Sequence, residues 1–225
     1  MSVQIIVREV EVRESSADLA LLDDGERARA ERKQDTAPFV TGHALVRRLL
    51  GELLDRDPGE LTFARHCTTC RSDLHGKPSL VGIPGWQFSL SYTSSLAVVA
   101  AAKGVDVGVD TEDLTDADFE GFAQATLARD EVEAFDSLSG RDLLVARARI
   151  WARKEAILKA TGHGLVVDPS EVLVSGPLDP PTLTAWRADE PAPPAVSLAD
   201  LEPTTDSHRA AVAALTDGPV EISHG

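Results

Sequence analysis

Residues 104–112 read GVDVGVDTE, a stretch in which apolar and polar side chains alternate. Successive side chains of a β-strand point to opposite faces, so this period predicts a strand over residues 105–111. One face carries the valines, which are Val105, Val107 and Val109. The other face carries a glycine and the acids, which are Asp106, Gly108, Asp110 and Glu112. The missing side chain of the glycine leaves space for a ligand or for another backbone.

The acids Asp110 and Glu112 lie two residues apart, about 6.5 to 7 Å along a strand. Like charges on one face repel unless a cation or a hydrogen-bond network lies between them. Mg²⁺ suits such a pair, because it binds one or two protein carboxylates together with water and substrate phosphates. The alternative is a strand end at which every acid is solvated. Asp106 is roughly 13 Å from Asp110 on strand geometry and is left out of the predicted site.

A second stretch, WARKEAILK at residues 151–159, has the pattern of a helix. Its Trp151, Glu155 and Lys159 are four residues apart and therefore form one stripe. An exposed Glu–Lys ion pair on such a stripe would contribute little, but the tryptophan favours packing against other residues. Lys154 lies four residues from an apolar neighbour on each side, so we expect it to be partly buried. The stripe would suit a site for magnesium and phosphate.

The rest of the chain predicts two similar α+β halves, residues 1–103 and 104–225. In each half a long helix ends at a glycine, and a buried apolar strand follows after a similar interval. We expect the strand over 105–111 to be the hairpin partner of the strand over 96–102. The halves would then pack as an intramolecular pseudo-dimer with a ligand cleft at the seam. The main elements are expected as strands over 3–12, 96–102, 105–111, 171–174, 182–188 and 210–215 and as helices over 26–33, 38–54, 129–138 and 141–161.

The composition fits a protein with a substantial core, since 43% of the 225 residues are hydrophobic. The formal net charge of −15 disfavours a nucleic-acid or anionic-membrane binder. An anionic ligand would therefore need a local basic patch. No apolar run approaches the roughly 20 residues of a membrane span, and the first residues lack the apolar core of a secretory signal. We expect a cytoplasmic protein.

Cys67 and Cys70 form an isolated CxxC flanked by His66 and His75. A redox pair would lack the βαβ context of thioredoxin-like motifs. The histidines could complete a structural zinc site, whereas residues of these types also meet by chance in loops. These interpretations stay open.

The two opening stretches are more specific together than apart. GVDVGVDTE followed by WARKEAILK resembles the signature of the 4'-phosphopantetheinyl transferases, (I/V)G(I/V)D…WxxKEAxxK. The two halves and the segments HGKP (75–78) and FSLSY (88–92) resemble the surfactin-synthetase-activating branch, whose members are single-chain pseudo-dimers. The resemblance covers roughly residues 20–216. It implies a monomeric enzyme that moves the 4'-phosphopantetheine arm of coenzyme A to a serine of an apo-carrier protein and releases adenosine 3',5'-bisphosphate.

The resemblance also implies roles for individual residues. Asp110, Glu112 and Glu155 would bind Mg²⁺, or Mn²⁺, together with the coenzyme A pyrophosphate. Lys159 and Lys154 would contact phosphate, and Glu155 would accept the proton of the serine hydroxyl. The carrier itself stays open: an acyl, peptidyl or aryl carrier of fatty-acid synthesis or of secondary metabolism would serve. We expect it to dock near residues 115–130, with Phe119, Phe122 and Leu127 as candidate contacts.

Four further positions align with family positions near the coenzyme A site, namely Arg27, Lys77, Ser91 and Tyr92. Two positions depart from the family pattern. Tyr92 stands where a histidine is typical, and Ala37–Pro38 stands where an arginine usually precedes the long helix. A phenol can donate a hydrogen bond to phosphate but brings no positive charge. Binding of the 3'-phosphate should therefore be weaker or different, unless Arg27 or Lys33 compensates.

Two other functions are kept as alternatives. The departures at Tyr92 and Pro38 are compatible with a catalytically weakened coenzyme A-binding or carrier-binding protein of the same fold. A magnesium-dependent phosphohydrolase would explain the acids but neither the helix stripe nor the repeated halves.

Overall fold

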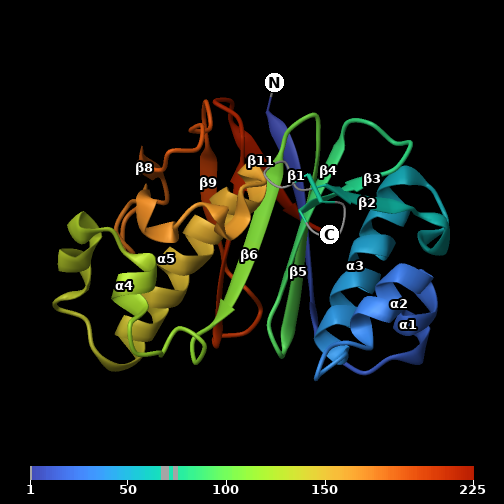
Figure 1. Ribbon diagram of the computed structural model, residues 1–225, viewed down its shortest axis with the longest axis horizontal. Coiled ribbons are helices and arrows are strands. Elements are labelled where there is room, and N and C mark those ends of the chain that lie inside the picture. The colour runs from blue at the N-terminus through green and yellow to red at the C-terminus, as the bar shows by residue number, and fades with distance from the viewer. Residues whose placement is uncertain (1, 67–70, 73–75) are drawn as a thin grey trace.

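Two β-sheets face each other in the middle of the molecule, and the long helices cover their outer sides (Figure 1). The computed structural model describes residues 2–66, 71–72 and 76–225. Alternating valines and alanines of both sheets form the apolar layer between them, including Val98, Ala100, Val107, Val109 and Val212. The fold is therefore mixed α+β, as the sequence predicted.

The first sheet and its helices come from the first half of the chain. Its strand order is β11-β1-β5-β4, and β5 is antiparallel to both β1 and β4. The outer face of this sheet packs against α3 through Leu45, Leu49 and Leu50. The elements are β1 (Val3–Glu11), α1 (Ser16–Leu21), α2 (Asp24–Ala30), α3 (Ala37–Leu54), η1 (Pro58–Glu60), β2 (Phe63–His66), β3 (Lys77–Leu80), β4 (Trp86–Tyr92) and β5 (Leu96–Lys103).

The second half repeats this plan. Its antiparallel sheet has the order β6-β10-β9 and packs against α5, as α3 does on the first sheet. Leaving β11 aside, both sheets have their last strand in the centre, in the orders β1-β5-β4 and β6-β10-β9. This shared order supports the predicted pseudo-dimer. The elements are β6 (Val107–Asp113), α4 (Phe122–Thr126), η2 (Arg129–Phe135), α5 (Gly140–Thr161), η3 (Gly164–Val166), η4 (Pro169–Glu171), β7 (Val172–Val174), β8 (Leu183–Trp186), β9 (Ser197–Leu201), β10 (His208–Ala214) and β11 (Val220–His224). The last strand, β11, crosses back and pairs in parallel with β1 of the first half.

The predicted hairpin between residues 96–102 and 105–111 is wrong. β5 pairs with β1 and β4, whereas β6 pairs with β10. Gly104, with φ of 78°, turns the chain out of the first sheet, and its N–H donates to the Gly85 carbonyl. The apolar faces of β5 and β6 then meet across the layer between the sheets, which buries both without a shared ladder.

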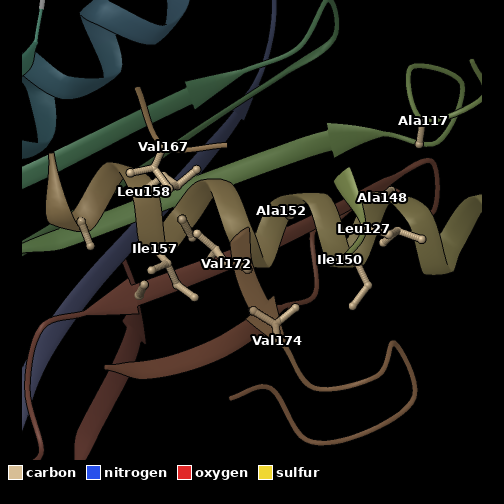
Figure 2. Packing of buried hydrophobic residues seen from close by; sticks show 14 of the residues in the cluster. Ala117, Leu127, Ala148, Ile150, Ala152, Ile157, Leu158, Val167, Val172 and Val174 are labelled. Carbon is tan, nitrogen blue, oxygen red and sulfur yellow. The ribbon is translucent and has the colours of Figure 1, made fainter. Parts of the chain in front are cut away.

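The helix α5 is held by an extended apolar cluster, part of which Figure 2 shows. Ile150, Ile157 and Leu158 are almost completely buried and belong to the same cluster as Val167 and Val172. The helix ends at Gly162, whose left-handed φ of 78° confirms the predicted C-terminal cap. Its last two turns are therefore fixed over β6.

Gly108 explains how closely α5 approaches β6. A Cβ at this position would lie 2.1 Å from the Ala156 carbonyl oxygen and 2.4 Å from the Ala160 nitrogen. The space predicted beside Gly108 is thus taken by another backbone. This contact brings Glu155 and Lys159 of α5 over the acidic face of β6.

Two further expectations concern membrane spans and the proposed zinc site. Within the described ranges, no helix has both the length and the apolar character needed to cross a membrane. The proposed zinc site involves Cys67, Cys70 and His75, which lie outside the described residues.

Candidate active site

Asp110 is the centre of a buried polar cluster between β4, β6 and α5. The Lys159 Nζ donates to its Oδ1 at 2.5 Å, and the Ser91 hydroxyl donates to the same oxygen at 2.8 Å. Lys159 also donates to the Ser91 oxygen at 3.0 Å. Asp110, Ser91 and Lys159, predicted from three separate stretches, are therefore in direct contact.

Glu112 and Glu155 belong to the same cluster. Burial, and after it the negative charge of Asp110, raise the pKa of Glu112 to about 9. Burial and Asp110 likewise raise the pKa of Glu155 to about 7, against the opposing charge of Lys159. Three carboxyl groups thus share a site with a single ammonium group, so at neutral pH part of their charge is balanced by bound protons.

The chemistry of these groups fits a hard divalent cation. Asp110 Oδ2 and Glu155 Oε1 are buried, and neither has a hydrogen-bond partner in the described part of the chain. Carboxylate oxygens are the ligands that Mg²⁺ and Mn²⁺ take up most readily. Among the described residues, however, no three acidic, histidine or cysteine side chains are already gathered as a ligand set. The side chain of Lys159 occupies the position beside Asp110 instead.

A cavity of about 790 Å³ opens beside this cluster. Lys159 belongs to both, since it lines the cavity wall and contacts Asp110. The described lining contains no Asp or Glu, although the protein carries a net charge of −15. Six cationic side chains line it, which are Arg29, Arg32, Lys33, Arg65, Lys77 and Lys159. This is the local basic patch that an anionic ligand would need.

Two arginines of the basic wall, Arg29 and Arg65, lie near each other. Burial, and then the charge of Arg29, lower the pKa of Arg65. The described residues offer no carboxylate ion pair to either arginine, and the buried Nε of Arg29 has no partner among them. The Arg29 guanidinium lies 5.9 Å from the centre of the Phe39 ring. Two adjacent cations without an ion-pair partner in the described residues, with only the more distant charge of Glu26 acting on Arg65, indicate an anion-binding corner.

Neutral aromatic groups surround this corner. Phe39 stacks on His43 with ring centres 3.8 Å apart, and Tyr92 packs edge-on against Phe39. Burial lowers the pKa of His43 to about 3, so the ring is neutral at physiological pH. Burial raises the pKa of Tyr92, whose phenol therefore keeps its proton as a hydrogen-bond donor. The positive charge here comes from the arginines alone.

Lys77, which the sequence predicts near the coenzyme A site, lies on β3 and lines the cavity. Its Nζ donates to Asp106 Oδ1 at 2.7 Å and to the Ala160 carbonyl at 2.8 Å. It thus connects the first half of the chain to the end of α5 and to the start of β6.

The structure does not bring Arg27 or Lys154 to the cavity. Arg27 donates to the carbonyls of Leu19 and Ala20, away from the cavity lining. Lys154 is completely buried, and its three N–H groups are taken by Thr126 O at 2.7 Å, Glu131 Oε2 at 2.5 Å and Pro169 O at 3.0 Å. No donor of Lys154 is left for a phosphate.

The predicted docking residues are also placed differently from one another. Phe122 and Leu127 are 2% and 7% exposed and belong to the core around α5. Phe119 is 40% exposed and packs edge-on against Trp151. Of the three candidates, only Phe119 offers a surface to a partner.

The sequence reasoning missed Arg29, Arg65 and His43. Arg27 and Arg29 are two residues apart on a helix and so point to nearly opposite sides. The pattern alone did not say which side faces a ligand. Arg65 lies in the short strand FARH, on the face opposite its two neighbours. Four residues are too few for the sequence to show which face lines a cavity.

Comparison with known proteins agrees with the motifs. The family model of the 4'-phosphopantetheinyl transferase superfamily matches residues 106–213. The 4'-phosphopantetheinyl transferase HetI of Nostoc sp. is 31% identical over 184 residues, which cover 77% of this chain and 75% of HetI. The chain belongs to the 4'-phosphopantetheinyl transferase superfamily.

Two further relatives of this superfamily match shorter parts of the chain. A Synechocystis protein, slr0495, whose name assigns it provisionally to the same activity, is 31% identical over 65% of this chain and 59% of its own length. The 4'-phosphopantetheinyl transferase psf-1 of Bacillus pumilus is 28% identical over 62% of this chain and 57% of its own length. The assignment to the surfactin-synthetase-activating branch stays a prediction.

Proposed function

We propose that the protein transfers the 4'-phosphopantetheine arm of coenzyme A to a serine of an apo-carrier protein and releases adenosine 3',5'-bisphosphate. The observation that carries this proposal is the contact between Lys159 and Asp110, which joins a three-carboxylate cluster to a basic cavity. The membership in the transferase superfamily supports it. A donor with phosphates at two places suits a cavity whose cations lie on α5 and β3 and also on α2 and β2.

The cations divide into two groups for such a donor. Lys159 and Lys77 would bind the pyrophosphate, because Lys159 also contacts the acidic cluster. Arg29 and Arg65 would bind the 3'-phosphate. They would thus take over the role of the basic residues that are typical where this chain has Tyr92 and Ala37–Pro38. The Tyr92 phenol would add a neutral donor. Arginine suits this role because its planar fork matches phosphate oxygens.

Asp110, Glu112 and Glu155 would hold a divalent cation, with Mg²⁺ as the first choice and Mn²⁺ as an alternative. When bound, the cation would neutralise the pyrophosphate oxygens as the bond to the leaving phosphate breaks. The unpartnered Asp110 Oδ2 and Glu155 Oε1 support this role. Lys159, released from Asp110, would then be available to the donor phosphate.

Glu155 would act as the general base. Its carboxylate would take the proton of the carrier serine, directly or through a water, while the serine oxygen forms a bond to the β-phosphorus of coenzyme A. The bond between that phosphorus and the bridging oxygen breaks, and adenosine 3',5'-bisphosphate leaves with both bonding electrons. Trp151, one turn earlier on α5, packs against Phe119 and Phe122 and so keeps this face of the helix in place.

Intact mass measurement tests this function directly. The protein is incubated with coenzyme A, Mg²⁺ and several apo-carrier proteins, and each carrier is expected to gain one phosphopantetheine group if it is a substrate. Tight binding of coenzyme A without any gain on any carrier would instead favour a catalytically weakened binding protein. Release of free phosphopantetheine in the absence of a carrier would favour a phosphohydrolase.

A further inference from the structure

Lys77 is the one lysine of the cavity wall that is held from two sides by the second half of the chain. Asp106, just before β6, and the Ala160 carbonyl, in the last turn of α5, each accept one of its N–H groups. An ammonium group has three N–H donors. Within the described residues, the third donor of Lys77 is therefore left over on a side chain that lines the cavity.

We propose that Asp106 is a positioning residue for the donor site, which fixes Lys77 so that its third N–H is presented to an anionic oxygen of the donor. This inference rests on the proposed function and adds a residue that the motif does not contain. The Asp106 side chain is half exposed, whereas Lys77 is mostly buried. The carboxylate thus holds the ammonium group from the solvent side and leaves the cavity side open.

The other groups around Lys77 do not compensate for Asp106. Burial lowers the pKa of Lys77, and the hydrogen bond and charge of Asp106 act in the opposite direction. The Ala160 carbonyl carries no formal charge. The described cavity lining beside Lys77 contains Arg65 of β2 and Lys159 and His163 near the end of α5, but no Asp or Glu, and His66 lies opposite Lys77 on β2. Asp106 therefore opposes the effect of burial on Lys77, beside the like charges of Arg65 and Lys159.

A competing interpretation makes the opposite prediction. If Asp106 only neutralised Lys77, a donor would have to break the ion pair, and removal of Asp106 would strengthen donor binding. The geometry favours positioning, because the two contacts that Lys77 makes in the described part of the chain leave one donor unused. Substitution by asparagine tests this cleanly, since the backbone carbonyl of Asp106, which accepts from the Leu215 N–H, is unchanged.

Lysine NMR gives a readout that does not depend on catalysis. The chain has only five lysines, so ¹³C-labelled lysine side chains can be resolved and assigned by substitution. In Asp106→Asn, the pKa of Lys77 is expected to fall below its wild-type value. Asp217→Asn, which removes an equal charge from an exposed turn outside the cavity lining, is expected to leave that pKa unchanged.

Calorimetric binding of coenzyme A completes the test. Asp106→Asn is expected to weaken binding about 3- to 10-fold at pH 7, and more at pH 9, as one charge-assisted hydrogen bond is misplaced or lost. In a Lys77→Gln background, Asp106→Asn is expected to have no further effect. An unchanged Lys77 pKa, tighter binding, or equal weakening in the Lys77→Gln background would each overturn the proposal. Failure of the wild-type protein to bind coenzyme A would instead overturn the proposed function, while the NMR result would still be readable.

Discussion

The two halves of the molecule share one plan but differ in the charges that they bring to the seam between them. The first half supplies cations from α2, β2 and β3, namely Arg29, Arg65 and Lys77. The second half supplies the carboxylates of β6 and α5, namely Asp110, Glu112 and Glu155. The same arrangement of helix on sheet thus presents mainly cations in one half, whereas the other half presents a carboxylate cluster together with Lys159.

The long helices show how this difference arises. In α3, the buried cation Arg47 binds Glu26 and the carbonyls of Pro58 and Leu61, so its charge is used within the first half. In α5, Lys154 is used in the same way, but Lys159, five residues later, faces the cavity. Through Lys159, α5 thus connects the carboxylate cluster of the second half to the cavity.

Removal of the proposed base, Glu155, should have the largest effect on the rate of transfer. In Glu155→Gln, transfer to a carrier is expected to fall about 10²- to 10⁴-fold, because a glutamine amide cannot accept the serine proton. Single-turnover transfer measured by intact mass gives the rate. Coenzyme A binding and the melting temperature are expected to stay near the wild-type values, and a near-normal rate would remove Glu155 from its role.

Lys154→Met should lower the stability of the second half without affecting coenzyme A binding. Loss of this ammonium leaves Glu131 and two carbonyls buried without their donor, so the free energy of unfolding should fall by about 3 kcal/mol. Denaturant unfolding measures this change. In the fraction that is folded, coenzyme A affinity should be unchanged, and a selective loss of affinity would restore the phosphate contact that the motif implies.

Arg29→Ala should weaken coenzyme A binding about 10-fold or more, through loss of a charge-assisted contact in the corner beside Tyr92. Binding of dephospho-coenzyme A, which lacks the 3'-phosphate, should change much less. Arg27→Ala is the matched control, since this arginine lies on the same helix outside the cavity. Equal losses for both donors, or for both variants, would place the 3'-phosphate elsewhere.

The carboxylate cluster should make stability depend on pH and on metal. The pKa values of Glu112 and Glu155 rise from 4.5 to about 9 and about 7 in the folded protein. Between pH 4.5 and 9 the folded state therefore binds more protons than the unfolded state, and the metal-free protein should lose stability as the pH rises.

A divalent cation that takes the place of those protons should reverse this trend. The melting temperature is expected to rise more on addition of Mg²⁺ at pH 8 than at pH 5, and the rise should be reduced in Glu112→Gln. A rise that is equal at both pH values would argue against binding at these carboxylates.

The sequence predicted the acidic face of β6 and the stripe on α5, because strand and helix periods fix which side chains share a face. That the two segments share one site was implied by the family resemblance and not by these periods. It also predicted the long helices and the strands over 3–12, 96–102 and 210–215. It did not predict which sheet β6 joins, since an apolar strand face is buried equally well by a ladder neighbour or by an opposing sheet. It missed β9 among prolines, and it missed the side on which Arg27 and Arg29 point.

The central claim is that Arg29 of the first half acts in donor binding while Glu155 of the second half acts in the reaction itself, and a kinetic comparison of Arg29→Ala with Glu155→Gln tests it most directly. Initial rates of carrier modification are measured by intact mass over a range of coenzyme A concentrations. We predict that Arg29→Ala regains nearly the wild-type rate at saturating coenzyme A, whereas Glu155→Gln does not at any concentration. Rescue of both variants, or of neither, would contradict the account.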